Sequence, residues 1–220
     1  MKEKFADFIA KSTVKAADRD HRRKINFNIG KYNSVVPQGK MQFTDLHLAR
    51  ERAKNIKWKA ISTLDTQLED FEAAITKRGA KVIWAENAAE ALAAVKKICE
   101  EKNCKTLVKS KSMVTEEIHL NEFLEKNGIE SVETDLGEYI QQLDGEPPYH
   151  IVTPAMHKSK EDVAKLFSHK LGTDPKATPE QLTLVARKVL REKYVQAEVG
   201  VTGANFIISD IGGIAITENE

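Results

Sequence analysis

The stretch from Thr106 to Leu143 constrains the fold of this 220-residue chain more than any other segment. Its pattern predicts, in order, a strand over 106–108, a loop over 109–112, a helix that ends at Asn127-Gly128, a strand over 129–133 and a helix over 136–143. Strands that alternate with helices pair in parallel and are covered by those helices. We therefore predict an α/β fold, with a mostly parallel sheet flanked by helices.

Further helices and strands are predicted on both sides of this stretch. Before it we expect a helix over 1–31, a break over 32–39, a helix over 45–77, a strand over 81–85 and a helix over 88–102. After it we expect a strand over 150–153, a helix capped by Ser159, a helix that begins at Thr178-Pro179, and a hairpin formed by 206–209 and 214–217. In the second helix, Leu68 is one of five apolar residues that form a stripe at helical spacing.

Charge divides the chain unevenly. Residues 1–60 hold 15 Lys and Arg against 6 Asp and Glu, whereas the remainder holds 19 against 27. We predict a helical N-terminal arm over 1–44 and an α/β domain over 45–220, which we expect to continue past its apolar last strand. The basic arm lacks any nucleic-acid recognition motif, so we expect it to lie against the acidic body or an acidic partner, and we predict no nucleic acid partner.

Cysteine content and hydropathy exclude several classes of protein. Cys99 and Cys104 are the only cysteines, which is too few for a disulfide framework or for an iron–sulfur cluster that needs four thiolates. The sequence contains no CxxC pair and no HExxH, so we predict no metal site. It also shows no signal peptide and no long apolar run. These observations predict a cytoplasmic protein without membrane insertion.

Polar residues follow the predicted strands, where ligands bind in parallel α/β sheets. Lys109, Ser110, Lys111 and Ser112 follow the central strand, and their ammonium and hydroxyl groups suit a small carboxylate or phosphate. The alternative is a purely structural loop, because Glu116 and Glu117 already bring negative charge to the next helix. Two further residues, His157 and Glu218, are candidates for catalysis because each follows a predicted strand.

Three segments carry a resemblance to a known family. These are KSKSMVTEE, VETDLGEYIQQL and EPPYHIVTPAMHK. From about Asp45 to Glu220 the chain resembles the N-terminal LUD domain of the lactate-utilization protein B family. The resemblance implies a fold related to the CoA-transferase and ribose-phosphate-isomerase group. It also implies a subunit of the cytoplasmic complex that oxidises L-lactate to pyruvate, with the A and C type subunits as partners.

The same resemblance implies electron transfer through two [4Fe–4S] clusters in a C-terminal ferredoxin-like part outside these residues. We therefore expect no cofactor within these 220 residues. Two alternatives remain open. One is an enzyme that handles small acids or acyl-CoA, with Glu218 as nucleophile beside Asn219, although Glu220 stands where such transferases have glycine. The other is a plain protein-interaction scaffold.

Overall fold

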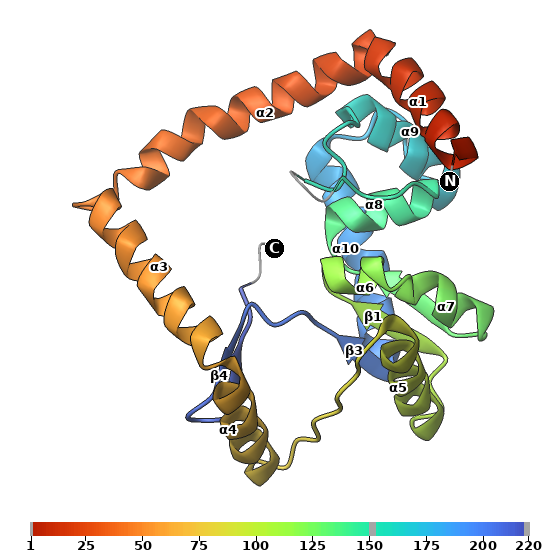
Figure 1. Cartoon of the computed structure of the whole chain (residues 1–220). Helices are drawn as coiled ribbons and strands as arrows, with labels where there is room; N and C mark the ends of the chain where they lie inside the picture. The colour runs from red at the N-terminus through yellow and green to blue at the C-terminus, as the bar shows by residue number, and fades with distance from the viewer. Residues whose placement is uncertain (1, 150–152, 218–220) are drawn as a thin grey trace. The chain divides into compact units, whose positions relative to one another are not determined.

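The computed structural model describes residues 2–149 and 153–217 (Figure 1). The helices are α1 (Lys2–Ala17), α2 (Arg19–Lys40), α3 (Leu46–Ser62), α4 (Leu64–Lys77), α5 (Ala88–Glu101), α6 (Met113–Glu117), α7 (Leu120–Lys126), α8 (Leu136–Asp144), α9 (Lys160–Leu171) and α10 (Pro179–Gln196). The strands are β1 (Thr106–Lys109), β2 (Glu130–Glu133), β3 (Val199–Val201), β4 (Phe206–Ile208) and β5 (Gly213–Ala215).

The chain forms two compact units, each built from two separate segments. Unit 1 contains the residues up to Leu46 together with Ile140–Val185, and unit 2 contains His47–Tyr139 together with the residues from Ala186 onward. The N-terminal helices α1 and α2 thus share a unit with residues from the middle of the chain. The predicted domain boundary between residues 44 and 45 remains a prediction.

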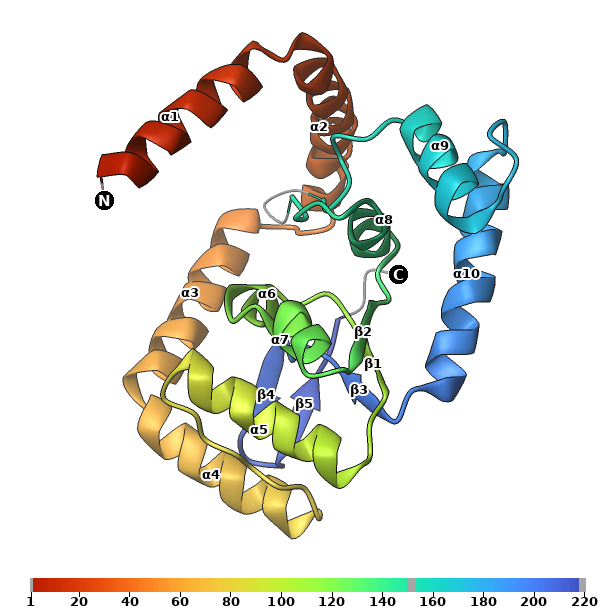
Figure 2. The same cartoon turned by 90° about the vertical axis from the view of Figure 1, so that its right-hand side faces the viewer.

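A small parallel sheet organises unit 2. Its strand order is β2-β1-β3, and β1 pairs in parallel with both neighbours. Helices α5 and α7 lie side by side against this sheet (Figure 2). The buried apolar core between them consists of Cys99, Cys104, Leu107, Leu120, Leu124 and Ile129. The predicted α/β class, with a parallel sheet flanked by helices, is confirmed.

The hairpin predicted near the C-terminus is also present in unit 2. Strands β4 and β5 pair antiparallel, and the turn between them packs on helix α4. Arg78 Nε donates to the Ile211 carbonyl oxygen at 2.7 Å. Gly212 has φ +58°, and a Cβ placed there would lie 2.3 Å from the Ile75 amide nitrogen. Only glycine fits this turn, because a side chain would collide with the backbone of α4.

In unit 1, polar contacts join α2 to the segment that follows α8. Lys24 Nζ lies 2.6 Å from Asp162 Oδ2, and the Asn28 side chain donates to the Met156 carbonyl oxygen at 2.7 Å. Helix α9 begins with a capping box in which Ser159 and Asp162 satisfy each other's backbone amides. Charged and polar side chains therefore hold α2 against residues 156–162 within unit 1.

Three predictions about the helices are wrong. The break predicted over 32–39 is helical, and Pro37 lies inside α2 although it has no N–H for the helical hydrogen bond. The break lies at Asp18, which caps α2. The helix predicted over 45–77 is interrupted at Thr63, which has a non-helical ψ of 28°. The helix after the loop is two short helices, because His119 between them is left-handed with φ 54°.

The predictions about strands also need correction. Residues 81–85 are not a strand, because no described segment pairs with them; Ile83 and Trp84 are more than half exposed. Strand β3 was missed, because three residues give too short a pattern and only the pairing with β1 defines it. The strand predicted over 150–153 falls mostly on residues 150–152, which lie outside the described residues. No helix in the described ranges has the length and apolarity needed to cross a bilayer.

Candidate functional site

The carboxyl edge of the sheet in unit 2 carries a buried ion pair. Lys109 ends β1, Glu133 ends β2, and the two residues are partners in the parallel register. Lys109 Nζ lies 2.7 Å from Glu133 Oε1, and the two residues are 1% and 3% exposed. Charged side chains are rarely buried unless they are paired. The sheet register therefore places a charge pair where parallel sheets carry their functional residues.

Two more carboxylates and an amide complete this cluster. Glu116 on α6 lies 3.5 Å from Lys109 Nζ, and the Asn121 side chain donates to Glu133 at 2.6 Å. One carboxylate oxygen from each of Glu116, Glu133 and Glu138 lies within 4.8 Å of the other two. Two of these side chains, Glu116 and Glu133, thus flank the Lys109 ammonium group, and Glu138 lies beside them.

The charge balance within the cluster raises the pKa of Glu138. Burial raises this pKa first, and the hydrogen bond with Glu133 and repulsion from its carboxylate add to the effect, giving about 8. The positive charge of Lys109 lowers the pKa of Glu138, but by less than burial and Glu133 raise it. Glu138 is therefore mainly protonated at neutral pH.

The three carboxylates do not form a convincing metal site. Oxygen ligands from Glu116, Glu133 and Glu138 suit a hard cation in principle. The ammonium group of Lys109 already lies 2.7 Å from Glu133 and 3.5 Å from Glu116. This lysine supplies the positive charge that a metal ion would otherwise bring.

The loop after Lys109 lines an open cavity of about 320 Å³ in unit 2. Ser110, Lys111 and Ser112 form one side, and the remaining lining residues are Met113, Val114, Gly203, Ala204, Asn205, Ile216 and Thr217. Lys111 is the only charged residue of this lining among the residues that the structure describes. A cavity with one cation and several hydroxyl and amide groups suits a small acid.

The structure separates the predicted loop residues by role. Lys109 belongs to the buried cluster and does not line the cavity. The Ser110 hydroxyl donates to Thr202 Oγ1 at 3.0 Å, and Ser112 caps α6. Because α6 has only five residues, its dipole adds little to anion binding. Lys111 is therefore the residue on which the predicted anion site chiefly depends.

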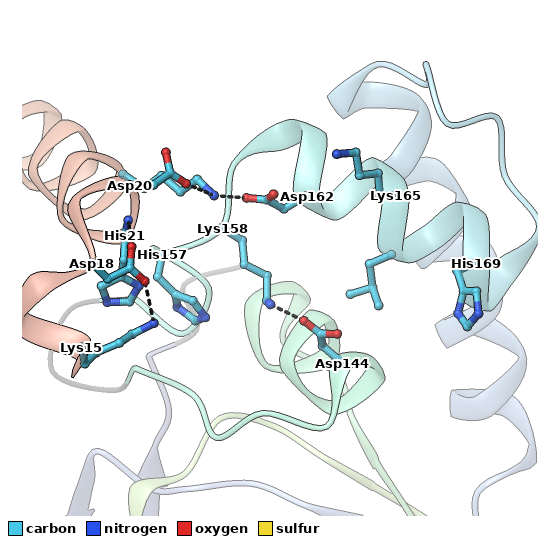
Figure 3. Close-up of a pocket in the computed structure, with 12 residues that line it drawn as sticks. Lys15, Asp18, Asp20, His21, Asp144, His157, Lys158, Asp162, Lys165 and His169 are labelled. Carbon is cyan, nitrogen blue, oxygen red and sulfur yellow. Dashed lines mark hydrogen bonds and ion pairs between the residues drawn. The ribbon is translucent and has the colours of Figure 1, made fainter. Parts of the chain in front are cut away.

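The two catalytic candidates have different outcomes. Glu218 lies outside the described residues. His157 belongs to unit 1, where its Nε2 lies 3.0 Å from Glu146 Oε2 and its ring stacks on Tyr149 with a centroid distance of 4.2 Å. The His157 side chain is only 10% exposed and lines a charged pocket in that unit (Figure 3). No sequence pattern pointed to this pocket.

The cysteines do not fit an iron–sulfur cluster. Cys99 and Cys104 are both buried in the apolar core of unit 2. Burial raises the pKa of Cys104 to about 11 and also raises the pKa of Cys99, which disfavours the thiolate that binds iron. With two thiols where a [4Fe–4S] cluster needs four thiolates, these residues cannot hold one.

Comparisons with known proteins agree on one family. The family model of the LUD domain matches residues 68–220. Curated relatives include lactate utilization protein B of Bacillus velezensis, 46% identical over 172 residues, and lactate utilization protein B of Bacillus subtilis, 45% identical over 172 residues. In both cases the alignment covers 78% of this chain and 36% of the relative. No solved structure gives a significant match.

Proposed function

The chain belongs to the LUD domain family, and on that premise we propose that it acts in lactate utilization, as part of a protein of the B type. The observation that carries this proposal is the 46% identity to lactate utilization protein B over 172 residues. The chain spans about a third of the length of these curated relatives. The activity of the whole protein is therefore proposed from the relatives, whereas the domain is assigned from the chain itself.

Within that role we propose that the whole protein transfers electrons as L-lactate becomes pyruvate, together with A and C type subunits in the cytoplasm. The electrons would pass through iron–sulfur clusters held by residues outside this chain. Cys99 and Cys104 support that division, since both thiols are buried and neither is suited to bind iron. The LUD domain would supply the protein surface and the small-acid site.

We assign the small-acid site to the cavity of unit 2. Lys111 would pair with the carboxylate of the acid, while the hydroxyl groups of Ser110 and Ser112 would accept or donate hydrogen bonds at its other polar atoms. The buried Lys109–Glu133 pair keeps β1 and β2 in register directly before this loop. A fixed loop binds a small ligand at lower entropic cost than a mobile one.

An exchange of domains tests the lactate role. Residues 68–220 would replace the matching segment of Bacillus subtilis lactate utilization protein B, in a strain that lacks its own copy. We expect growth on L-lactate to be restored. An exchanged protein that accumulates to the normal level, as measured by immunoblot, but leaves the strain unable to grow on L-lactate contradicts the proposal.

Calorimetric titration tests the small-acid site directly. We expect the 220-residue chain to bind L-lactate or pyruvate at millimolar concentration, and we expect Lys111→Glu to weaken binding by at least about tenfold. Lys97→Glu is the matched control, because Lys97 is exposed on α5 and does not line the cavity. Equal binding by the Lys111→Glu and Lys97→Glu variants would show that the loop is structural.

A second function, acyl or CoA transfer, is favoured by one observation. Thr217 lines the cavity, and Glu218, the proposed nucleophile, follows it in the sequence. A glutamyl–CoA thioester would form on that carboxylate when an acyl-CoA donor is supplied, with release of the free acid. Mass spectrometry after incubation with acetyl-CoA, compared with the Glu218→Gln variant, distinguishes this enzyme from a binding domain.

A further inference from the structure

The charged pocket of unit 1 is separate from the cavity of the proposed small-acid site. It has a volume of about 500 Å³ (Figure 3). One wall comes from the junction of α1 and α2, and the other from residues 144–169, all within unit 1. Leu166 is the only aliphatic residue in its lining among the described residues, which otherwise consists of lysine, aspartate and histidine. Such a lining selects polar, charged ligands.

The carboxylates of this pocket are already engaged by neighbouring groups. Asp18 accepts from the His21 amide at 2.9 Å, and Asp20 pairs with Lys24 at 2.9 Å. Asp144 forms an ion pair with Lys158. Each of these three acids therefore has at least one carboxylate oxygen occupied by a neighbouring group of the protein.

Asp162 is the most strongly held of the four pocket carboxylates. It accepts from the Ser159 amide at 2.7 Å and from Lys24 at 2.6 Å. Burial raises the pKa of Asp162, but the hydrogen bonds from Lys24 and Ser159 outweigh burial and hold this pKa at about 2. The Asp162 carboxylate therefore stays ionised at neutral pH and remains paired with Lys24.

The lining contains four lysines and four aspartates, and its basic groups differ in how far they are already engaged. An ammonium group carries three N–H donors, and Lys24 and Lys158 each use two carboxylates while being only 18% and 10% exposed. Lys165 and His169, one helical turn apart on α9, line the pocket without an ion pair or hydrogen bond to any residue that the structure describes. The two polar lining residues that lack a partner among the described residues are therefore both basic, which favours an anionic ligand.

We propose that this pocket binds a small polyanion, a molecule that carries two or more carboxylate or phosphate groups. Its volume falls in the range of small-molecule sites, which is roughly 300–1,000 Å³. A single carboxylate such as lactate would leave much of that volume and several donors unused. Lys165 and His169 bind one anionic group, and the N–H donors that Lys24 and Lys158 retain beyond their two carboxylates each bind the other. This site is independent of the lactate role.

Calorimetric titration with pyrophosphate and citrate tests the proposal, since the first probe carries phosphate groups and the second carboxylates. We expect one of them to bind with a submillimolar Kd and stoichiometry of one. Lys165→Glu should weaken this binding by at least about tenfold, since it replaces attraction by repulsion. Lys170→Glu should change it by less than about twofold, because Lys170 is exposed on the same helix but does not line the pocket.

The folding of the variants is easily checked. Lys165 is exposed, so Lys165→Glu should leave the thermal midpoint within about 2 °C of the wild type. Failure of both probes to bind at millimolar concentration overturns the proposal, as does equal binding by the Lys165→Glu and Lys170→Glu variants. Lys111→Glu, in the cavity of unit 2, should leave binding of the polyanion unchanged, which separates this site from the small-acid site.

Discussion

Lys109 and Glu133 are register partners at the ends of two parallel strands, and their side chains form a buried ion pair of 2.7 Å. This position joins the sheet to the loop that lines the cavity of unit 2. Glu133 and Glu138 are both buried beside Lys109, and the pKa of Glu138, raised to about 8, keeps that side chain mainly protonated at neutral pH. The stability of this edge of the sheet therefore depends on the charge of Lys109 and on the protonation of Glu138.

Replacing the lysine by an uncharged residue of similar length tests the ion pair. We expect Lys109→Met to lower the free energy of unfolding by about 3–5 kcal/mol, because it leaves a buried carboxylate without its partner. Lys97→Met, at an exposed position on α5, should change it by less than about 0.5 kcal/mol. Urea denaturation of both variants gives the two values. A loss below about 1 kcal/mol for Lys109→Met would mean that water reaches Glu133.

The proton on Glu138 gives the stability a pH dependence with a definite sign. Its pKa in the folded chain is about 8, above the value of 4.5 that it has when exposed. Between these two values the folded chain holds a proton that the unfolded chain releases, so this group destabilises the fold as pH rises from 4.5 to 8. We expect Glu138→Gln to remove that contribution.

The measurement compares urea denaturation of the wild type and Glu138→Gln at pH 5, 6, 7 and 8, values that span most of the interval between the two pKa values of Glu138. The difference between the free energy of unfolding of the variant and that of the wild type should shift in favour of the variant with each increase in pH. Parallel profiles would show that Glu138 is ionised in the folded chain, and that the charge cluster holds no extra proton.

Local signals in the sequence predicted local structure well. Ser159 and Thr178 are predicted at helix starts, and each caps the helix that follows it. Capping depends on residues three positions apart, so the sequence contains the whole interaction. The prediction of a strand over 81–85 is wrong for the opposite reason. Its apolar pattern is typical of a strand, but a strand requires a partner, which no nearby residue reveals.

The candidate site was predicted only in part for a related reason. The run Lys109–Ser112 was correctly placed after the central strand, but both lysines looked equally available for an anion. Pairing with Glu133 buries Lys109 and leaves Lys111 beside the cavity. The pocket of unit 1 was not found at all, because it brings Lys24 beside Asp162, far away in the sequence.

The turn of the hairpin offers a test of packing in unit 2. Gly212→Ala should lower the free energy of unfolding by more than about 2 kcal/mol, because a Cβ there would lie 2.3 Å from the Ile75 amide and φ is +58°. Gly30→Ala is the matched change in open space within α2 and should raise stability by about 0.5–1 kcal/mol. Similar effects of the two changes in thermal denaturation would contradict the packing of the hairpin on α4.

The cysteines predict how the chain responds to iron and to thiol reagents. We expect Cys99 and Cys104 to react with a disulfide reagent only slowly in the folded chain and quickly in urea, because both are buried and have raised pKa values. Anaerobic incubation with iron and sulfide should leave the chain colourless. Stoichiometric iron with a broad visible absorption band would show that the two thiols bind a cluster after all.

His21 gives unit 1 a pH dependence opposite in sign to that of Glu138. Burial lowers the pKa of His21 first, and the charges of Lys15 and His157 lower it further. Its ring contacts Tyr149 edge-on and lies 5.6 Å from that of His157. The folded chain therefore resists the protonation of His21 that the unfolded chain accepts at about pH 6.5.

Because the unfolded chain then binds more protons, His21 should lower the free energy of unfolding as pH falls below about 6.5 and should contribute nothing above it. His21→Gln removes the titrating group, so the variant should lose less stability than the wild type between pH 7 and pH 5. If the free energy of unfolding of His21→Gln and of the wild type falls equally with acid, the His21 ring is exposed to water in the folded chain.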